Sequence, residues 1–307
     1  GRSATGARGQ GGWRIDGILH PVTTPLSVLV ALSLGVALII LGLDRAAVKM
    51  IRPPLKPIRW KVGDLPFPSR PISISSGDQE LSGWIVEPKE DLGRAVLVLA
   101  HGWGSNHGTM SRLAEPLLRM GYPVLLFDVR QHGESGEAPY VTARHFRDDI
   151  LAALKTCRKL FPGRPTVLIG HSMGGSTGVL AALQDSLLKG FISIGAPADL
   201  WGVWAYQLDQ KGLPGRAIIK GLSLFLRRRA GEPWKDLDPL RRASDLRLPF
   251  VVLHGEKDQS VPVEQAFLLA RAAGVEPWII PDWGHTDVLE SPELHEALKK
   301  VLRALPA

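Results

Sequence analysis

From residue 71 onward, short apolar runs alternate with segments whose apolar residues recur at helical spacing. The run Arg94–Ala100 lacks polar alternation, as expected for a strand that helices cover on both faces. Strands that alternate with helices build a mainly parallel sheet with helices on both faces, so the pattern predicts an α/β fold. An antiparallel pair, Pro71–Ser75 and Leu81–Glu87, is expected to precede them, with a turn at Gly77-Asp78. The other predicted strands are Pro123–Asp128, Thr166–Gly170, Phe191–Gly195, Phe250–Gly255 and Pro277–Pro281, and the predicted helices lie near Thr109–Met120, Ala143–Leu160, Met173–Gln184, Val263–Ala273 and Pro292–Ala304.

The same pattern sets the predicted domain boundaries. The α/β core is predicted over residues 71–197 and 246–307. The stretch between them, residues 198–245, is longer than a connection between two core elements needs, so we expect a helical cap inserted into the core. Ahead of the core, the sequence predicts a flexible leader over residues 1–20, a membrane-anchor helix over residues 21–45 and a proline-rich basic spacer over residues 46–70.

The membrane prediction rests on the stretch Pro21–Leu43, which contains no charged residue. At about 1.5 Å per residue, this stretch is long enough to cover the hydrocarbon core of a bilayer. A cleaved signal peptide usually has a shorter apolar region, and a buried globular helix would show a polar face. A single-pass transmembrane helix is therefore predicted. More basic residues follow the stretch than precede it, which favours a cytoplasmic catalytic domain.

The formal net charge of +7 raises the question of a nucleic-acid partner. The sequence contains no recognisable nucleic-acid module, and its excess basic residues gather beside the apolar stretch and inside the predicted cap. We therefore expect an anionic membrane surface, not nucleic acid, near these residues. Cys157 is the only cysteine, so no intrachain disulfide can form, and its place in a helical pattern predicts a small core residue rather than a nucleophile.

A candidate nucleophile lies between a predicted strand and a predicted helix. Gly170-His171-Ser172-Met173-Gly174 matches the G-x-S-x-G pattern. The glycines suit this pattern because a sharp turn leaves no room for side chains beside the serine. The turn would present the Ser172 hydroxyl at the positive end of the following helix. A glycine-rich turn with a capping serine is the simpler reading of the five residues alone.

A serine hydroxyl needs an adjacent base, which is itself oriented by a third group. His285 follows the last predicted strand and is the expected base. Asp258 lies in the loop after the preceding strand and is the expected acid, with Glu256 and Asp199 as rivals. The order Ser, Asp, His along the chain is the one that a strand–serine–helix turn of this type requires.

The loop after the predicted strand Arg94–Ala100 is expected to supply the oxyanion-binding part of the active site. It reads His101-Gly102-Trp103-Gly104-Ser105-Asn106. Backbone N–H groups in such a loop, and directly after the nucleophile, can bind a developing oxyanion. We assign these donors to Trp103 and Met173. The histidines near this loop lack metal-binding spacing, so we expect no metal and no other cofactor.

Together these motifs resemble the α/β-hydrolase family over about residues 71–304. The Asp128–Ser135 loop, with the pattern Asp-x-Arg-x-His-Gly-x-Ser, is similar to that of single-domain esterases, lipases and perhydrolases, although Gln131 stands where a glycine is usual. Because a serine occupies the turn, the resemblance argues against dehalogenases and epoxide hydrolases, which use an aspartate there. It implies an α/β-hydrolase fold and an anchored serine hydrolase acting on acyl esters or thioesters.

The predicted cap suggests the substrate. Its apolar residues recur at helical spacing, which predicts an amphipathic helix over the active site, either as a lid or simply packed on the body. We expect an apolar acyl pocket beneath it and a carboxylesterase or lipase activity. A peptidase or amidase, a thioesterase, a perhydrolase or acyltransferase, and a non-catalytic binding protein are the alternatives. The predicted pocket residues are Trp103, Trp201, Trp204, Leu222 and Phe225.

Overall fold

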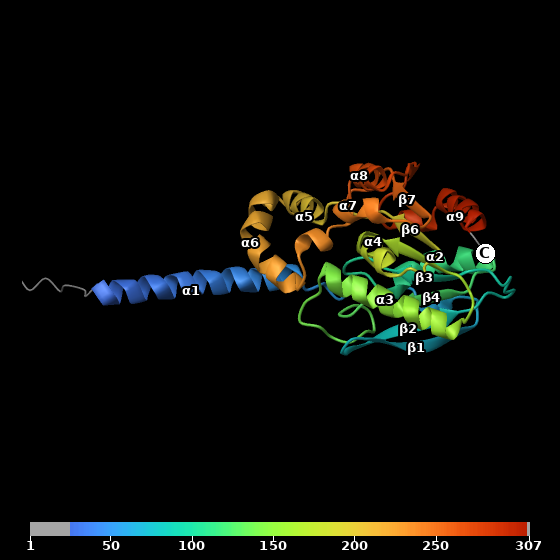
Figure 1. The fold of residues 1–307 in the computed structure, drawn as a ribbon, viewed down its shortest axis with the longest axis horizontal. Coiled ribbons are helices and arrows are strands. Elements are labelled where there is room, and N and C mark those ends of the chain that lie inside the picture. The colour runs from blue at the N-terminus through green and yellow to red at the C-terminus, as the bar shows by residue number, and fades with distance from the viewer. Residues whose placement is uncertain (1–24, 306–307) are drawn as a thin grey trace, which may run out of the picture. The chain divides into compact units, whose positions relative to one another are not determined.

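A computed structural model describes residues 25–305 of the chain. Its strands form one eight-stranded sheet in the order β1-β2-β4-β3-β5-β6-β7-β8 (Figure 1). β1 and β2 pair with antiparallel neighbours, and the strands from β4 to β8 run parallel, which confirms the predicted mainly parallel α/β fold. The strands are β1 (Ser69–Ser76), β2 (Gln79–Val86), β3 (Val96–Ala100), β4 (Val124–Phe127), β5 (Thr166–His171), β6 (Gly190–Ile194), β7 (Phe250–Gly255) and β8 (Pro277–Ile280).

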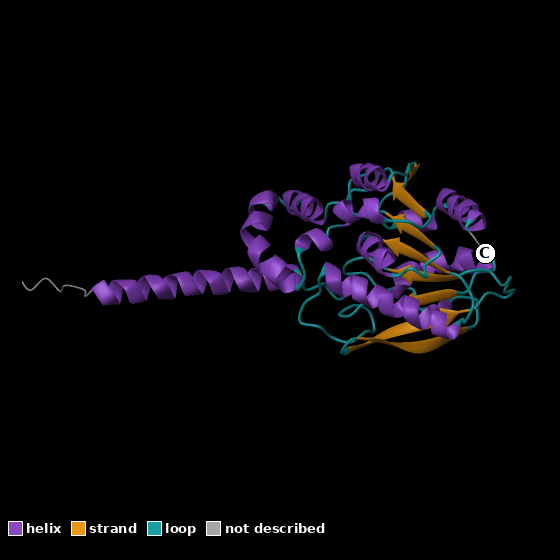
Figure 2. Cartoon of the chain, in the orientation of Figure 1, coloured by secondary structure: helices purple, strands orange, loops and turns teal. Residues whose placement is uncertain are grey.

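Helices cover both faces of this sheet (Figure 2). Helices α3, α4 and α8 pack in one apolar cluster and helices α2 and α9 in the other. The central strand β3 contributes to both clusters, because Val96 and Val98 point to one face and Leu97 and Leu99 to the other. The helices of the core are α2 (His107–Arg119), α3 (Ala143–Leu160), α4 (Met173–Gln184), α8 (Glu264–Ala273) and α9 (Pro292–Ala304).

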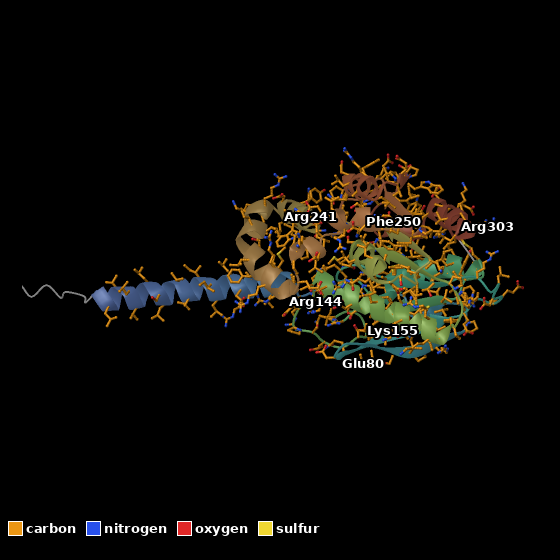
Figure 3. The ribbon with its side chains drawn as sticks, in the orientation of Figure 1. Glu80, Arg144, Lys155, Arg241, Phe250 and Arg303 are labelled. Atoms are coloured by element: carbon orange, nitrogen blue, oxygen red, sulfur yellow. The ribbon has the colours of Figure 1, made fainter. Side chains whose placement is uncertain are left out.

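The central strands of the sheet are buried on both faces. Every residue of β3, β4 and β6 is buried, which explains why these strands show no polar alternation in the sequence. Phe191 and Phe250 stack across β6 and β7 with ring centroids 5.0 Å apart. Charged side chains such as Lys155 and Arg303 lie on the outside of the helices (Figure 3).

The element boundaries follow local capping. Helix α2 begins at His107, ahead of the predicted Thr109, because Asn106 is its N-cap and accepts a hydrogen bond from the backbone of Gly108 at 3.1 Å. The predicted turn between β1 and β2 lies at Gly77-Asp78, where Gly77 has a φ of 63°. Only glycine adopts this left-handed conformation without strain.

The stretch predicted as a cap, residues 198–245, connects β6 to β7 and is helical. It contains α5 (Leu200–Asp209), α6 (Gly215–Ala230) and the short α7 (Pro239–Arg242), with two 3-10 turns at Trp234–Asp236 and Ala243–Asp245. The buried face of α6 consists of Ile219, Leu222, Leu226 and Ala230. These positions match the helical spacing seen in the sequence.

Helix α1 (Pro25–Met50) precedes the core. Within the described residues, only its stretch Leu26–Met50 is long and apolar enough to cross a membrane, by length and composition. The boundary between two compact units of the chain lies inside α1, after Gly42. The predicted leader, residues 1–20, lies outside the described residues.

The predicted spacer, residues 46–70, differs from a free tether. Its first five residues belong to α1, and Ile51 and Pro53 are buried. The Ile51 carbonyl accepts a hydrogen bond from the backbone of Val141 at 2.8 Å. The segment therefore packs on the α/β core, and its last residues enter β1.

Candidate active site

Ser172 lies at the sharp turn between β5 and α4. Its φ of 55° and ψ of −121° are unusual for a residue with a side chain. The neighbouring glycines permit the turn because a Cβ on Gly170 would lie 2.4 Å from the Gly174 carbonyl oxygen, and one on Gly174 would lie 2.5 Å from the Ala100 carbonyl oxygen. The backbone N–H of Ser172 donates to the carbonyl of Ile194 at 2.8 Å, which ties the turn to β6.

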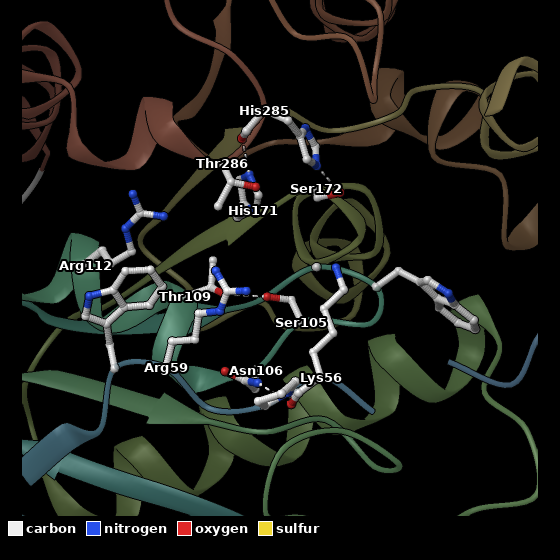
Figure 4. Close-up of a pocket in the computed structure, with 14 residues that line it drawn as sticks. Lys56, Arg59, Ser105, Asn106, Thr109, Arg112, His171, Ser172, His285 and Thr286 are labelled. Atoms are coloured by element: carbon white, nitrogen blue, oxygen red, sulfur yellow. Dashed lines mark hydrogen bonds between the residues drawn. The ribbon is translucent and has the colours of Figure 1, made fainter. Parts of the chain in front are cut away.

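Three side chains that the sequence proposes as catalytic lie within hydrogen-bond distance of one another. His285 Nε2 is 3.0 Å from Ser172 Oγ, and His285 Nδ1 is 2.6 Å from Asp258 Oδ2. They come from the loops after β5, β7 and β8, whose carboxyl ends meet at one edge of the sheet. Figure 4 shows His285 directed toward Ser172.

The Asp258 carboxylate is buried and fully engaged. Its Oδ1 accepts hydrogen bonds from the backbones of Ser260 and Val261, each at 2.8 Å. Burial acts to raise the pKa of Asp258, but hydrogen bonds from His254 and His285 outweigh it and hold the pKa well below its usual value. Asp258 is therefore ionised at neutral pH.

The two rival carboxylates bind elsewhere. Glu256 is exposed and accepts a hydrogen bond from the backbone of Asp282 at 3.2 Å. Asp199 is the N-cap of α5 and accepts from the backbone of Gly202 at 3.0 Å. Neither side chain contacts His285 within the described residues.

The loop after β3 lies directly against Ser172. A Cβ on Gly102 would lie 2.7 Å from the Ser172 Cβ, so only glycine fits there. The backbone N–H of Trp103 donates to no acceptor among the described residues. Met173 is the first residue of α4, where N–H groups lack a partner within the helix. Trp103 and Met173 therefore adjoin residues that contact or form the turn at Ser172, and their role as oxyanion donors stays a prediction.

The loop after β4 is joined to the loop after β3 by hydrogen bonds of two histidines. His132 Nε2 accepts a hydrogen bond from the backbone of Gly104 at 3.0 Å. His101 Nε2 accepts from the backbone of Val129 at 3.0 Å. Burial lowers the pKa of His132 to about 3, so this imidazole is neutral and can act as an acceptor. The histidines of the two loops thus cross-link β3 and β4 beyond their carboxyl ends.

Comparisons with known proteins agree with this fold. A family model described as "alpha/beta hydrolase fold" matches residues 95–215. The chain is 29% identical to rat monoglyceride lipase over 213 residues, covering 59% of this chain and 70% of that protein. It is 36% identical to human monoglyceride lipase over 93 residues, which are 30% of this chain and only 31% of that protein.

A solved structure covers more of the chain. The Pyrococcus furiosus esterase Pf2001 superposes with a TM-score of 0.69 at 24% identity, over 84% of this chain and 99% of the esterase. This chain has the α/β-hydrolase fold. The resemblance drawn from its motifs is thereby confirmed.

Two histidines of this α/β-hydrolase that the sequence does not single out hold the candidate active site. His171 Nε2 donates to the carbonyl of His285 at 2.7 Å, and burial lowers the pKa of His171 to about 3. His254, a buried residue of β7, places its Nε2 3.3 Å from Asp258 Oδ2 and 2.9 Å from the carbonyl of Val261. His171 precedes Ser172 and His254 precedes Gly255, and neither position in the sequence signals its contact. The contact of His171 joins residues 114 positions apart, whereas His254 and Asp258 are only four residues apart.

The hollow beside Ser172 differs from the predicted apolar pocket. It has a volume of about 380 Å³. Of the five predicted pocket residues, only Trp103 lines it. Polar and basic side chains supply much of the wall (Figure 4). The lining residues are Lys56, Pro57, Arg59, Trp60, Gly102, Trp103, Ser105, Asn106, Thr109, Arg112, His171, Ser172, His285 and Thr286.

The other four predicted pocket residues, Trp201, Trp204, Leu222 and Phe225, pack in an apolar cluster of the cap. Leu222 and Leu226 are buried in it together with Ala47 and Ile51. The apolar face of α6 is covered by the end of α1 and the residues that follow it. Trp103 belongs to the same cluster, and its ring centroid lies 6.2 Å from that of Trp204. The acyl pocket expected beneath the cap stays a prediction.

The structure also bears on two other kinds of reactive group, the cysteine thiol and metal-ligating side chains. Cys157 is buried, and burial raises the pKa of its thiol to about 12, so no thiolate is present at neutral pH. No cluster of three or more metal-ligating side chains occurs among residues 25–305.

Proposed function

We propose that this hydrolase cleaves carboxylic esters through an acyl-enzyme on Ser172. The observation that carries the proposal is the pair of contacts at His285: 3.0 Å from Nε2 to Ser172 Oγ and 2.6 Å from Nδ1 to Asp258 Oδ2. A hydroxyl, an imidazole and a carboxylate in this order are the groups that acyl transfer to serine requires. Two proteins similar to this chain, a monoglyceride lipase and an esterase, are named for the same reaction.

The ionisation of Asp258 determines the tautomer of His285. A carboxylate only accepts hydrogen bonds, so His285 Nδ1 carries the hydrogen and Nε2 has a free lone pair. Nε2 takes the proton from Ser172 Oγ as the oxygen attacks the ester carbonyl carbon. The imidazolium that forms is stabilised by the adjacent negative charge of Asp258.

The attack moves the carbonyl π electrons onto oxygen. The backbone N–H groups of Trp103 and Met173 donate to this oxyanion, and the positive end of α4 adds to its stabilisation. The tetrahedral intermediate collapses to an acyl-enzyme when His285 Nε2 protonates the leaving alcohol oxygen. Water then enters by the same route: it gives its proton to His285, attacks the acyl carbon and releases the acid with regeneration of Ser172.

Hydrolysis of 4-nitrophenyl butyrate tests the proposal. We expect turnover by the wild type and a loss of at least about a thousandfold in kcat for Ser172→Ala, since that variant lacks the nucleophile. Ser223→Ala is the matched control, because the Ser223 hydroxyl bonds only to the carbonyl of Lys220 on α6. The corresponding butyranilide separates an esterase from an amidase. Equal activity of wild type and Ser172→Ala would exclude the proposed nucleophile.

We propose further that α1 anchors the enzyme in a membrane as a single-pass helix with a cytoplasmic catalytic domain. The support is the apolar stretch Leu26–Met50, whose leucines are exposed. The enzyme should stay in the membrane pellet after a carbonate wash. Replacing both Leu34 and Leu38 by lysine should release it, because each charge near the centre of a bilayer costs about 2.5–3.5 kcal/mol. Release of the wild type would exclude the anchor.

A further inference from the structure

The hollow beside Ser172 is strongly basic. Lys56, Arg59 and Arg112 line it together with Ser172 and His285, and no aspartate or glutamate is among its described lining residues. Figure 4 shows the three cationic side chains around the hollow that holds the candidate nucleophile. A concave site lined by one sign of charge attracts ligands of the opposite sign.

Among the residues that the structure describes, only one of these cations has an acidic partner. Arg112 forms an ion pair with Glu290, and its guanidinium also lies 4.6 Å from the centre of the Trp60 ring. Lys56 and Arg59 form no ion pair with any residue between positions 25 and 305. Two positive charges in the same hollow as Ser172 and His285 therefore have no counter-charge in the described part of the chain.

The backbone that carries Lys56 and Arg59 is fixed on the core. The side-chain amide of Asn106 donates to the carbonyl of Lys56 at 3.2 Å. At Gly108, a Cβ would lie 2.6 Å from the carbonyl oxygen of Trp60, so the two backbones are in close contact. The cations are thus presented to the hollow from a packed segment, and ligand binding need not order a free chain.

We propose that the ester substrate carries an anionic group, a phosphate or a carboxylate, which Lys56 and Arg59 bind. The arginine fork and the lysine ammonium are the side chains that recognise such oxyanions. The inference rests on the proposed ester hydrolysis and names its substrate class. It adds a charged group to the substrate that the sequence leads us to expect, an ester with an apolar acyl group.

The experiment compares matched substrates that differ only in charge, with the full chain in a non-ionic detergent. One pair is 1-octanoylglycerol and its 3-phosphate, with the anion on the alcohol side. The other is the 4-nitrophenyl ester of glutaric acid and its methyl ester, with the anion on the acyl side. We expect about a tenfold higher kcat/KM for the anionic member of at least one pair, as a charge-assisted contact provides. The favoured pair assigns the side of the ester that enters the basic hollow.

The variants test whether Lys56 and Arg59 cause the preference. In K56Q/R59Q, the ratio of anionic to neutral kcat/KM should fall to about one. Arg52→Gln is the matched control: Arg52 is an exposed cation of the same segment that does not line the hollow, so this variant should keep the wild-type ratio. Added NaCl should lower the ratio in the wild type, because Lys56 and Arg59 are exposed to solvent.

Two results would overturn the inference: no preference for the anionic member in either pair, or a preference that survives in K56Q/R59Q. Both presuppose that the wild type hydrolyses the neutral esters, in which case the proposed function stands and only the anionic substrate class is lost. If no ester of either charge is cleaved, the proposed function fails and the inference falls with it.

Discussion

Ser172 combines a strained backbone with close neighbours that have no side chains. Its positive φ costs free energy in a non-glycine residue, of order 1–3 kcal/mol. The strain is kept because Gly170, Gly174 and Gly102 let three backbones meet around the hydroxyl. A methyl group at Gly102 would contact Ser172 itself. The strained turn also places Ser172 Oγ within hydrogen-bond distance of His285.

At the residue scale, Ser172, Asp258 and His285 could be selected from the sequence because each follows a strand end in the required order. His171 and His254 could not. The contact of His171 with the carbonyl of His285, 114 residues away, depends on how the end of β5 and the loop after β8 lie in space. His254 contacts Asp258 only four residues further on, but no motif in the sequence marks its side chain as the partner of that carboxylate.

The choice of Asp258 over its nearest rival gives a direct prediction. Asp258→Asn should lower kcat for 4-nitrophenyl butyrate by about 10³–10⁴-fold, since an amide neither fixes the tautomer nor stabilises the imidazolium. Glu256→Gln, in the same loop, should stay close to wild type because Glu256 contacts the backbone of Asp282. Steady-state kinetics of the two variants decide the matter, and near-normal turnover by Asp258→Asn would reject the assignment.

At the element scale, α6 shows what periodicity can and cannot predict. The spacing of Ile219, Leu222 and Leu226 correctly indicates an amphipathic helix. It does not indicate the partner of the apolar face, which includes Ala47 and Ile51. A buried face looks the same in sequence whichever element covers it. The partner here comes from a part of the chain far from α6.

Two leucines of α6 provide a matched test of this packing. Leu222→Ala should lower the free energy of unfolding by about 2–3 kcal/mol, because a buried leucine loses its contacts and leaves a cavity. Leu224→Ala should change it by less than about 0.5 kcal/mol, since Leu224 is 72% exposed. Chemical denaturation of both variants in the same detergent measures the difference. Equal effects would show that α6 does not pack through Leu222.

At the scale of the whole molecule, the buried histidines make stability depend on pH. His132 and His171 are buried, and burial lowers the pKa of each to about 3. Between the unfolded pKa of about 6.5 and this value, the unfolded chain binds protons that the folded protein does not. Stability contributed by the neutral imidazoles is therefore complete above the unfolded pKa and decreases as the pH falls.

We expect each of these two histidines to cost about 2 kcal/mol of unfolding free energy at pH 5.0 relative to pH 7.5. Denaturant titrations at the two pH values measure the sum. His132→Gln removes one titrating group while keeping an acceptor for the backbone of Gly104, so its pH dependence should be smaller. Identical stability of the wild type at both pH values would contradict burial of neutral imidazoles.

The proline-rich segment after α1 also belongs to this largest scale. Its composition predicts a spacer, yet in the structure Lys56 and Trp60 form a wall of the hollow beside Ser172. The reason is a set of long-range backbone contacts, such as that of Lys56 with Asn106, which composition does not encode. Local sequence patterns were enough to predict the fold class and to place the loops that carry Ser172, Asp258 and His285. They could not predict which residues line the hollow, because those residues come together only in the folded core.

Active-site labelling tests the central claim most directly. A fluorophosphonate bonds covalently to a serine hydroxyl only where a base activates it and an oxyanion site receives the phosphonyl oxygen. We predict one adduct per chain, located by peptide mass spectrometry at Ser172, and its disappearance in Ser172→Ala and His285→Ala. Absence of labelling in the folded wild type, or an adduct at another residue that persists in Ser172→Ala, would contradict the account.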